Sequence, residues 1–392
     1  MSTTAAAARA EAQLERRREA IEASGWGERF KLVQPHNLCF WVYVILVAIG
    51  LLQFVREAQH FTGFLAPSLI SASILFALYG LGIFWALRLM DRYAHKPLAL
   101  VLAAFAWGAT AAVYGIAVHG NDANIALMAK LFGQAFAADW GAALSAPFVE
   151  ETAKGAGFVL ILALAPRLIR SLYDAIFVGA FIGLGFQILE DIQYGLNGAV
   201  AQFGSDQFGG VISTFLLRGA TGITSHALYT AVFSAGLLYA IGTSSHRRRV
   251  GIGLALMAAA VLAHGVWDGA AAIGEGGVGA NVAMLAAALI GWTALIVAVR
   301  RGMGPEREWM RAILAPEVSS GTLKAEELDA LVARRKERKR FIHGAGGHKE
   351  RKRAKHLLVA AGDLARELAA SGGADSPGVE HARAEIARLR SA

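Results

Sequence analysis

Eight apolar stretches dominate this sequence, and each approaches or exceeds the roughly 20 residues that a helix needs to cross a bilayer. They cover residues 38–55, 64–90, 98–118, 141–165, 172–196, 210–242, 251–272 and 279–299. Inside a bilayer every backbone amide must find its hydrogen bond within the protein, and a helix provides that bond within a single segment. The sequence therefore predicts an all-α fold, a polytopic transmembrane helix bundle of about eight spans.

Two stretches differ from a plain spanning helix. Residues 125–137 are apolar but short and include Lys130, so we expect an interfacial or re-entrant helix there. Residues 210–242 exceed the length of one span, which predicts a kink near Gly219 or Gly222.

Basic residues outside the spans indicate the orientation of the chain. The N-terminal segment contains Arg16 and Lys31, and alternate loops contain Lys96, Arg167 and residues 247–249, whereas the intervening loops carry almost no positive charge. Cytoplasmic loops are enriched in Lys and Arg, so we expect both termini in the cytoplasm of a multi-pass protein of the cytoplasmic (inner) membrane. Three parts follow: a cytoplasmic helical segment (1–37), a transmembrane domain (38–299) and a basic helical tail (300–392).

The tail holds 20 Lys and Arg against 13 Asp and Glu, concentrated in the runs 334–340 and 348–356. Three interpretations remain open: solvated helix faces, adhesion to anionic lipid head groups, and contact with nucleic acid. Nucleic acid is the least favoured partner, because no aromatic residues are interleaved with the basic ones.

Ionisable residues interrupt four consecutive spans, although each costs about 3 kcal/mol at the centre of a membrane helix. The predicted topology places them at similar depth in the outer half of the bilayer, where the helices can converge on one polar cavity. They are Glu150, Glu151, Lys154, Glu190, Arg218, His226, His264 and Asp268.

Water activation is the chemistry that such a set favours. A buried carboxylate becomes a stronger base, and a histidine beside it can orient water or carry a proton. Two histidines with one or two carboxylates are equally a zinc-binding set. Cys39 is the only cysteine, which excludes a site built from several thiolates. The cofactor is therefore either none or zinc.

The motifs on these spans resemble the PrsW family of intramembrane proteases, which is related to the type II CAAX prenyl endopeptidases. The resemblance covers residues 140–270 and rests on EExxK at Glu150, GxxxGxGF at Gly179 followed by Glu190, Arg218 with His226, and HxxxD at His264. It implies a catalytic core near 140–272 and an endopeptidase that cleaves a membrane-anchored protein, for example an anti-sigma factor.

The same resemblance suggests roles for individual residues. Glu150 would act as general base, His226 would orient the water, and His264 with Asp268 would stabilise the oxyanion. Glu151, Lys154 and Arg218 would set the local charge, and Glu190 would be a second carboxylate or a partner for Arg218. In a metal-dependent version, Glu150, His226 and His264 would be the ligands.

Two other classes of function fit the same residues. A non-catalytic membrane scaffold would use the polar groups to bind a partner helix. A proton-coupled transporter would use them as a relay. The transporter is less favoured, because the two halves of the chain contain no matched pair of interrupted apolar segments.

Overall fold

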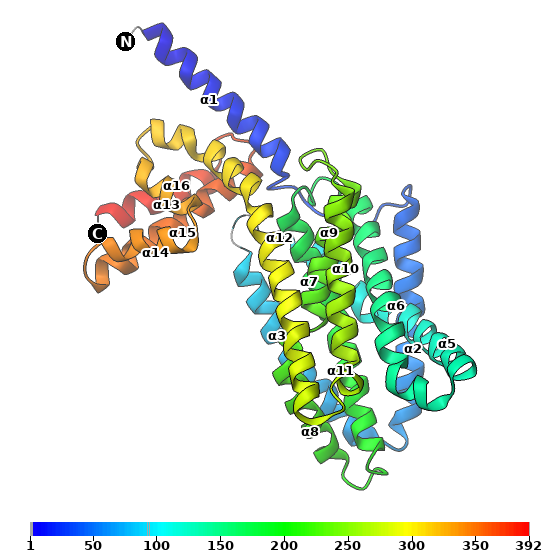
Figure 1. Ribbon diagram of the computed structural model, residues 1–392. Coiled ribbons are helices and arrows are strands. Elements are labelled where there is room, and N and C mark those ends of the chain that lie inside the picture. Colours follow the sequence, from blue (N-terminus) through cyan, green and yellow to red (C-terminus); the bar gives the residue numbers. More distant parts are fainter. Residues whose placement is uncertain (1–2, 92, 94, 392) are drawn as a thin grey trace.

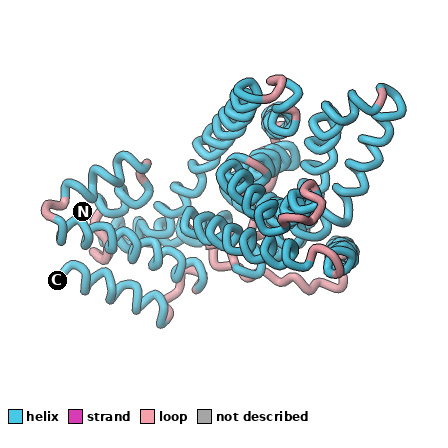
Figure 2. Tube along the Cα trace, turned by 90° about the horizontal axis from the view of Figure 1, so that it is seen from below, coloured by secondary structure: helices cyan, strands magenta, loops and turns pink. Residues whose placement is uncertain are grey.

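The computed structural model describes residues 3–91, 93 and 95–391, and the described residues form helices and connecting turns with no β-strand. Figure 1 shows two parts: a bundle of long helices, and a smaller group of helices near the two chain ends. Figure 2, a view turned by 90°, shows the smaller group lying to one side of the bundle rather than over its end.

The bundle begins with α2 (Leu38–Thr62) and α3 (Ala66–Met90). A continuous helical run follows, made of α4 (Leu98–Ala106), the π-helix η1 (Trp107–Ala117) and α5 (Val118–Phe132). The remaining bundle helices are α6 (Gln134–Leu164), α7 (Leu172–Val200), α8 (Gln207–Thr221), the short 3₁₀ turn η2 (Gly222–Thr224), α9 (His226–Ile241), α10 (Val250–Asp268), the short α11 (Ala270–Ile273) and α12 (Gly277–Ser319).

Helix α7 forms the centre of the bundle. Every residue from Leu172 to Ile188 is buried, and α7 packs against α3, α8, α9 and η1. Its start is fixed by a capping box, in which Ser171 and Asp174 satisfy each other's backbone amides. A helix that is apolar on all sides is stable only when other helices surround it, as they do here.

All eight predicted spans coincide with helices. By length and composition, six described segments could cross a membrane: α2, α3, Leu98–Phe132, α7, α10 and α12. Helix α6 carries Glu150, Glu151 and Lys154, and the stretch 210–242 is divided between α8 and α9. The predicted kink is confirmed, because the helix breaks at η2 and Ser225, directly after Gly222.

The limits predicted for a separate helix at 125–137 are wrong. Helix α5 continues η1 without interruption and ends at Phe132, because Gly133 adopts a positive φ of 92° that ends one helix and begins the next. The preceding π-helix is anchored to α6 through Trp107, whose Nε1 donates to the Ala153 carbonyl oxygen (2.9 Å).

The tail is less separate from the bundle than its composition predicts. Helix α12 runs unbroken through the expected boundary at 299/300, and its second half carries the buried side chains of Trp309, Met310 and Ile313. This half of α12 packs against α1 (Thr3–Ser24), α13 (Ala325–Val332) and α15 (His348–Ala370). Helix α14 (Arg335–Gly344) packs against α13 and α15, and α16 (Pro377–Ser391) packs against α15. The helix continues because this small second core surrounds its polar half.

A buried ion network joins the two ends of the chain. Glu317 on α12 pairs with Arg17 of α1 (2.8 Å) and with Arg383 of α16 (2.9 Å). These ion pairs join α1, α12 and α16. We call α1, the second half of α12, and α13 to α16 together the tail module.

Candidate active site

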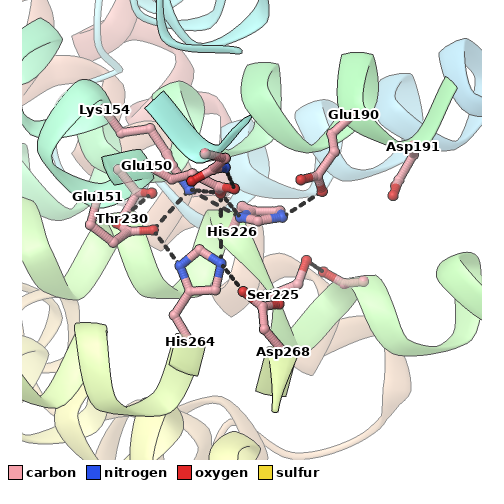
Figure 3. A network of polar contacts seen from close by, with 12 residues as sticks. Glu150, Glu151, Lys154, Glu190, Asp191, Ser225, His226, Thr230, His264 and Asp268 are labelled. Carbon is pink, nitrogen blue, oxygen red and sulfur yellow. Dashed lines mark hydrogen bonds and ion pairs between the residues drawn. The ribbon is translucent and has the colours of Figure 1, made fainter. Parts of the chain in front are cut away.

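The structure brings all eight predicted ionisable residues into one cluster, drawn from α6, α7, α8, α9 and α10. Figure 3 labels all of them except Arg218. Glu150, Glu151, Lys154, His226 and His264 are all buried, with at most 4% of any of them exposed. The side chains of Asp268, Glu190 and Arg218 keep 21%, 17% and 17% exposure, so the cluster opens on their side.

The helix break at Gly222–Ser225 sets the position of His226. Because the chain leaves helical geometry at Ser225, His226 becomes the first residue of α9 and lies at the level of the α6 and α10 residues. Gly183 of α7 allows the approach, since a Cβ there would lie 2.3 Å from the His226 carbonyl oxygen. The break lies where the length of the apolar stretch and its glycines predicted a kink.

Lys154 holds the two α6 carboxylates together. Its Nζ lies 2.8 Å from Glu151 Oε1 and 3.4 Å from Glu150 Oε2, and the ammonium also lies 4.0 Å from the centre of the Phe186 ring. Lys154 therefore contacts both carboxylates, and the shorter contact is to Glu151. Compensation by an ammonium lowers the cost of burying carboxylates in a low dielectric.

In each histidine, one ring nitrogen lies next to the carboxylate of Glu190 or Glu151, and the other lies next to the carboxylate of Glu150. His226 Nε2 lies 2.8 Å from Glu190 Oε2, while its Nδ1 lies 3.7 Å from Glu150 Oε2. His264 Nδ1 lies 3.2 Å from Glu151 Oε1, while its Nε2 lies 3.6 Å from Glu150 Oε2. Figure 3 shows both rings turned toward the end of the Glu150 side chain.

Glu190 contacts both a histidine and an arginine of the cluster. One oxygen, Oε2, contacts His226 and also accepts from Arg218 Nη2 (2.6 Å). Arg218 Nε donates to Asp191 (2.5 Å), and its guanidinium lies over the Tyr194 ring at 4.4 Å. Arg218 therefore holds in place the Glu190 carboxylate that orients His226. Among the described residues, it makes no contact with the ring nitrogens that face Glu150.

Sequence reasoning missed a chain of neutral groups behind Glu150. Asn121 of α5 donates from Nδ2 to Glu150 Oε1 (3.1 Å) and accepts from the Ser145 hydroxyl (2.9 Å). Ser145 in turn accepts from Asn124 (3.2 Å). The motif NDAN at 121–124 was the available signal, but an amide beside an apolar run is ordinarily read as a loop residue.

Two further contacts hold the acidic and imidazole groups in place. Thr230 donates from Oγ1 to Glu151 Oε2 (3.1 Å), and the Tyr229 ring stacks on His264 with centroids 5.2 Å apart. Both residues lie on α9, one turn beyond His226. Asp268, one turn beyond His264 on α10, places Oδ2 3.3 Å from His264 Nε2.

The donor set fits a single divalent metal ion. Glu150, His226 and His264 each offer one ligand atom, and these atoms lie within 4.8 Å of one another. Ligands at about 2.1 Å on a zinc tetrahedron are separated by roughly 3.4 Å, close to the 3.6 and 3.7 Å between Glu150 Oε2 and the two histidines. Neither nitrogen of the buried His264 has a hydrogen bond of good geometry among the described residues.

The surroundings of the three donors strengthen this fit. Metal-bound histidines usually hold their second nitrogen against a carboxylate or carbonyl, which fixes the ring orientation. Glu190 and Glu151 lie in these positions, and Asn121 occupies the second oxygen of Glu150. Lys154 Nζ lies 3.0 Å from His226 Nδ1, so the ammonium must withdraw toward Glu151 when a cation is bound.

Comparison with known proteins is consistent with this geometry. A family model described as PrsW family intramembrane metalloprotease matches residues 96–299, more than half of the chain. Comparisons with curated proteins and with solved structures give no match. The matched region contains every site residue named above, from Asn121 to Asp268. The chain therefore belongs to the PrsW family and is a multi-pass intramembrane protease.

Proposed function

We propose that this protein is a metal-dependent endopeptidase that cleaves a membrane-anchored protein in the outer half of the bilayer. The observation that carries the proposal is the arrangement of three buried donor atoms, each on a group whose other polar atom lies no more than 3.2 Å from a polar atom of a neighbour. Purely structural polar contacts between membrane helices would have no need to leave three donors converging on one point.

Glu150, His226 and His264 would hold the metal ion. A bound zinc ion supplies acidity to a coordinated water molecule and polarises a carbonyl oxygen. Glu190 and Glu151 orient the two imidazoles, and Asn121 leaves Glu150 Oε2 directed into the site. Glu150 is then a ligand, in place of the general base that the motif resemblance suggests.

Asp268 is the carboxylate best placed to receive a proton. Its Oδ2 lies next to His264 Nε2, and its side chain is the most exposed of the cluster, on the side from which substrate and water can reach the site. Glu190 and Arg218 form the rest of that edge. Lys154 balances the charge of Glu151 in the buried interior.

The substrate class follows from where the site lies. The charge distribution of the loops supports cytoplasmic termini in the inner membrane, which puts the cluster in the outer half of the bilayer. A peptide bond there belongs to a membrane-anchored protein. An anti-sigma factor is the example that the family resemblance favours.

Metal dependence can be tested on the purified protein in vesicles that also contain membrane proteins from cells lacking the gene. New N-termini are mapped by mass spectrometry, and bound metal is measured in parallel. We expect cleavage products and about one zinc per chain, both lost on chelation and both restored by zinc.

Variants separate the alternatives. His264→Ala should lose metal and cleavage, while Glu308→Gln, which neutralises an exposed carboxylate in the tail module, should lose neither. Cleavage that survives chelation would support the metal-free mechanism with Glu150 as base. Cellular function that survives both His264→Ala and Glu150→Ala would support the scaffold.

A further inference from the structure

The tail module carries its positive charge at one edge. Residues 334–356, which we call the basic hairpin, comprise α14, the first part of α15 and the turn between them. They contain eleven Lys and Arg against two Glu, whereas the rest of the tail from residue 300 contains nine Lys and Arg against eleven Asp and Glu. Such segregation is not expected of helix faces that are merely solvated.

Most of these side chains are free to bind a partner. Lys336, Lys339, Lys352 and Lys355 are exposed, and within the described parts of the chain none of them forms an ion pair with a carboxylate. By contrast, Arg383, Arg388 and Arg390, elsewhere in the module, are all paired with acidic residues.

Buried contacts fix the hairpin to the rest of the tail module. Beyond residue 356, α15 contributes the buried side chains of Leu358, Leu364 and Leu368 to the core of the module. That core includes the second half of α12, which extends directly from the membrane bundle. The position of the hairpin relative to the bilayer is therefore set by α12.

The hairpin lies beside the bundle rather than beyond its end. Figure 1 shows α14 and the start of α15 as the lowest part of the module, level with the upper part of α3 rather than above the bundle. Figure 2 shows the module outside the outline of the bundle. A bilayer surrounding the bundle would thus lie beneath the basic hairpin.

We infer that the basic hairpin binds the anionic head groups of the membrane surface beside the bundle. Each basic residue near an anionic leaflet strengthens association roughly fivefold, so several exposed lysines together are sufficient for a stable contact. The inference does not depend on the proposed metal chemistry. The contact would hold the tail module, and through α12 the bundle, in a defined orientation to the lipid surface.

A fluorescent probe on the turn of the hairpin tests the inference in the full-length protein. Cys39→Ser removes the only cysteine, and Ala345→Cys provides one attachment site between α14 and α15 for a polarity-sensitive dye. The labelled protein is placed in nanodiscs of phosphatidylcholine alone or in nanodiscs enriched in phosphatidylglycerol. We expect a blue shift only with phosphatidylglycerol, reversed in about 1 M salt, where the Debye length is about 3 Å.

Charge-matched variants decide the source of the signal. Lys336→Gln, Lys339→Gln and Lys352→Gln together should weaken the association roughly a hundredfold and abolish the shift. Arg311→Gln, Lys324→Gln and Arg388→Gln, exposed elsewhere in the module, should leave it intact. Equal emission in both lipids would overturn the inference, as would a shift that only an added oligonucleotide produces. Loss of the shift in the second set of variants would also overturn it.

Discussion

Asn121 offers the sharpest test of how the site is organised. The change Asn121→Leu keeps the number and branching of the side-chain heavy atoms but removes the Nδ2 donor that holds Glu150 Oε1 at 3.1 Å. A hydrogen bond to a charged group contributes about 1.5–3 kcal/mol, which corresponds to about a 10- to 150-fold loss of kcat. KM should change little, because Asn121 lies behind Glu150 and not on the exposed edge formed by Asp268 and Glu190.

Two companion variants make the prediction quantitative. Asn121→Asp is isosteric but faces Glu150 with a second carboxylate oxygen, so its activity should fall below that of Asn121→Leu. Asn124→Leu removes only the neutral bond to Ser145, one step further away. A neutral bond contributes about 1 kcal/mol, so we expect a loss of no more than about fivefold.

The assay is steady-state cleavage of a mapped substrate in vesicles, with zinc affinity measured on the same preparations. The reasoning would be refuted by an Asn121→Leu enzyme within twofold of the wild type. It would also fail if Asn121→Leu and Asn124→Leu lost equal activity and equal thermal stability, because the chain of neutral groups behind Glu150 would then have only a structural role.

Three other outcomes follow from the geometry. Glu190→Gln should weaken zinc binding about 10- to 100-fold, since the orienting group of His226 loses its charge; titration with a competing chelator measures this, and unchanged affinity would contradict the orienting role. Lys154→Met should destabilise the metal-free protein by about 3–5 kcal/mol, because a buried carboxylate pair loses its counter-ion; an unchanged melting temperature in detergent would argue against that pairing. In the loop before α4, burial would lower the pKa of the Lys96 ammonium, but the neighbouring carboxylates, Asp174 first, raise it above its usual value. The stability that this pair contributes is then fully present below the unfolded pKa of about 10.4 and is lost only as the pH rises through the higher folded pKa. The free energies of unfolding of Lys96→Met and wild type should therefore differ by a constant amount between neutral and mildly alkaline pH. A difference that shrinks within that range would refute the assignment.

The sequence predicts best those parts of the fold for which any alternative structure would cost much free energy. Long apolar runs have few alternatives to a membrane helix, so each predicted span coincides with helical structure. The break before His226 was predictable as well, because a run too long for one span with glycines at 219 and 222 favours a kink there. Ionisable residues inside such runs are rare enough that the cluster could be identified before its geometry was known.

The features that escaped prediction are formed by residues that would cost little free energy in another place. Asn121, Ser145 and Thr230 are neutral, and their importance depends on which oxygen of a distant carboxylate they meet. The end of α5 at Phe132 depends on the positive φ of Gly133 rather than on any loss of hydrophobicity. Likewise, α12 passes the boundary at 299/300 because Trp309 and Ile313 find a second core, which composition alone does not reveal.

The uninterrupted course of α12 bears on how this protein can be divided. With 43 residues, and about 1.5 Å of rise per residue, the helix is a rod of about 65 Å that runs from the tail module to Gly277 and passes α9 at Gly291. There it rests on Leu228 and Tyr229, and Tyr229 lies flat against His264. A truncation after residue 299 would cut this rod and strip α1 of the partner for its buried Arg17. The tail and the catalytic helices are therefore better regarded as one mechanical body than as an enzyme with an appendage.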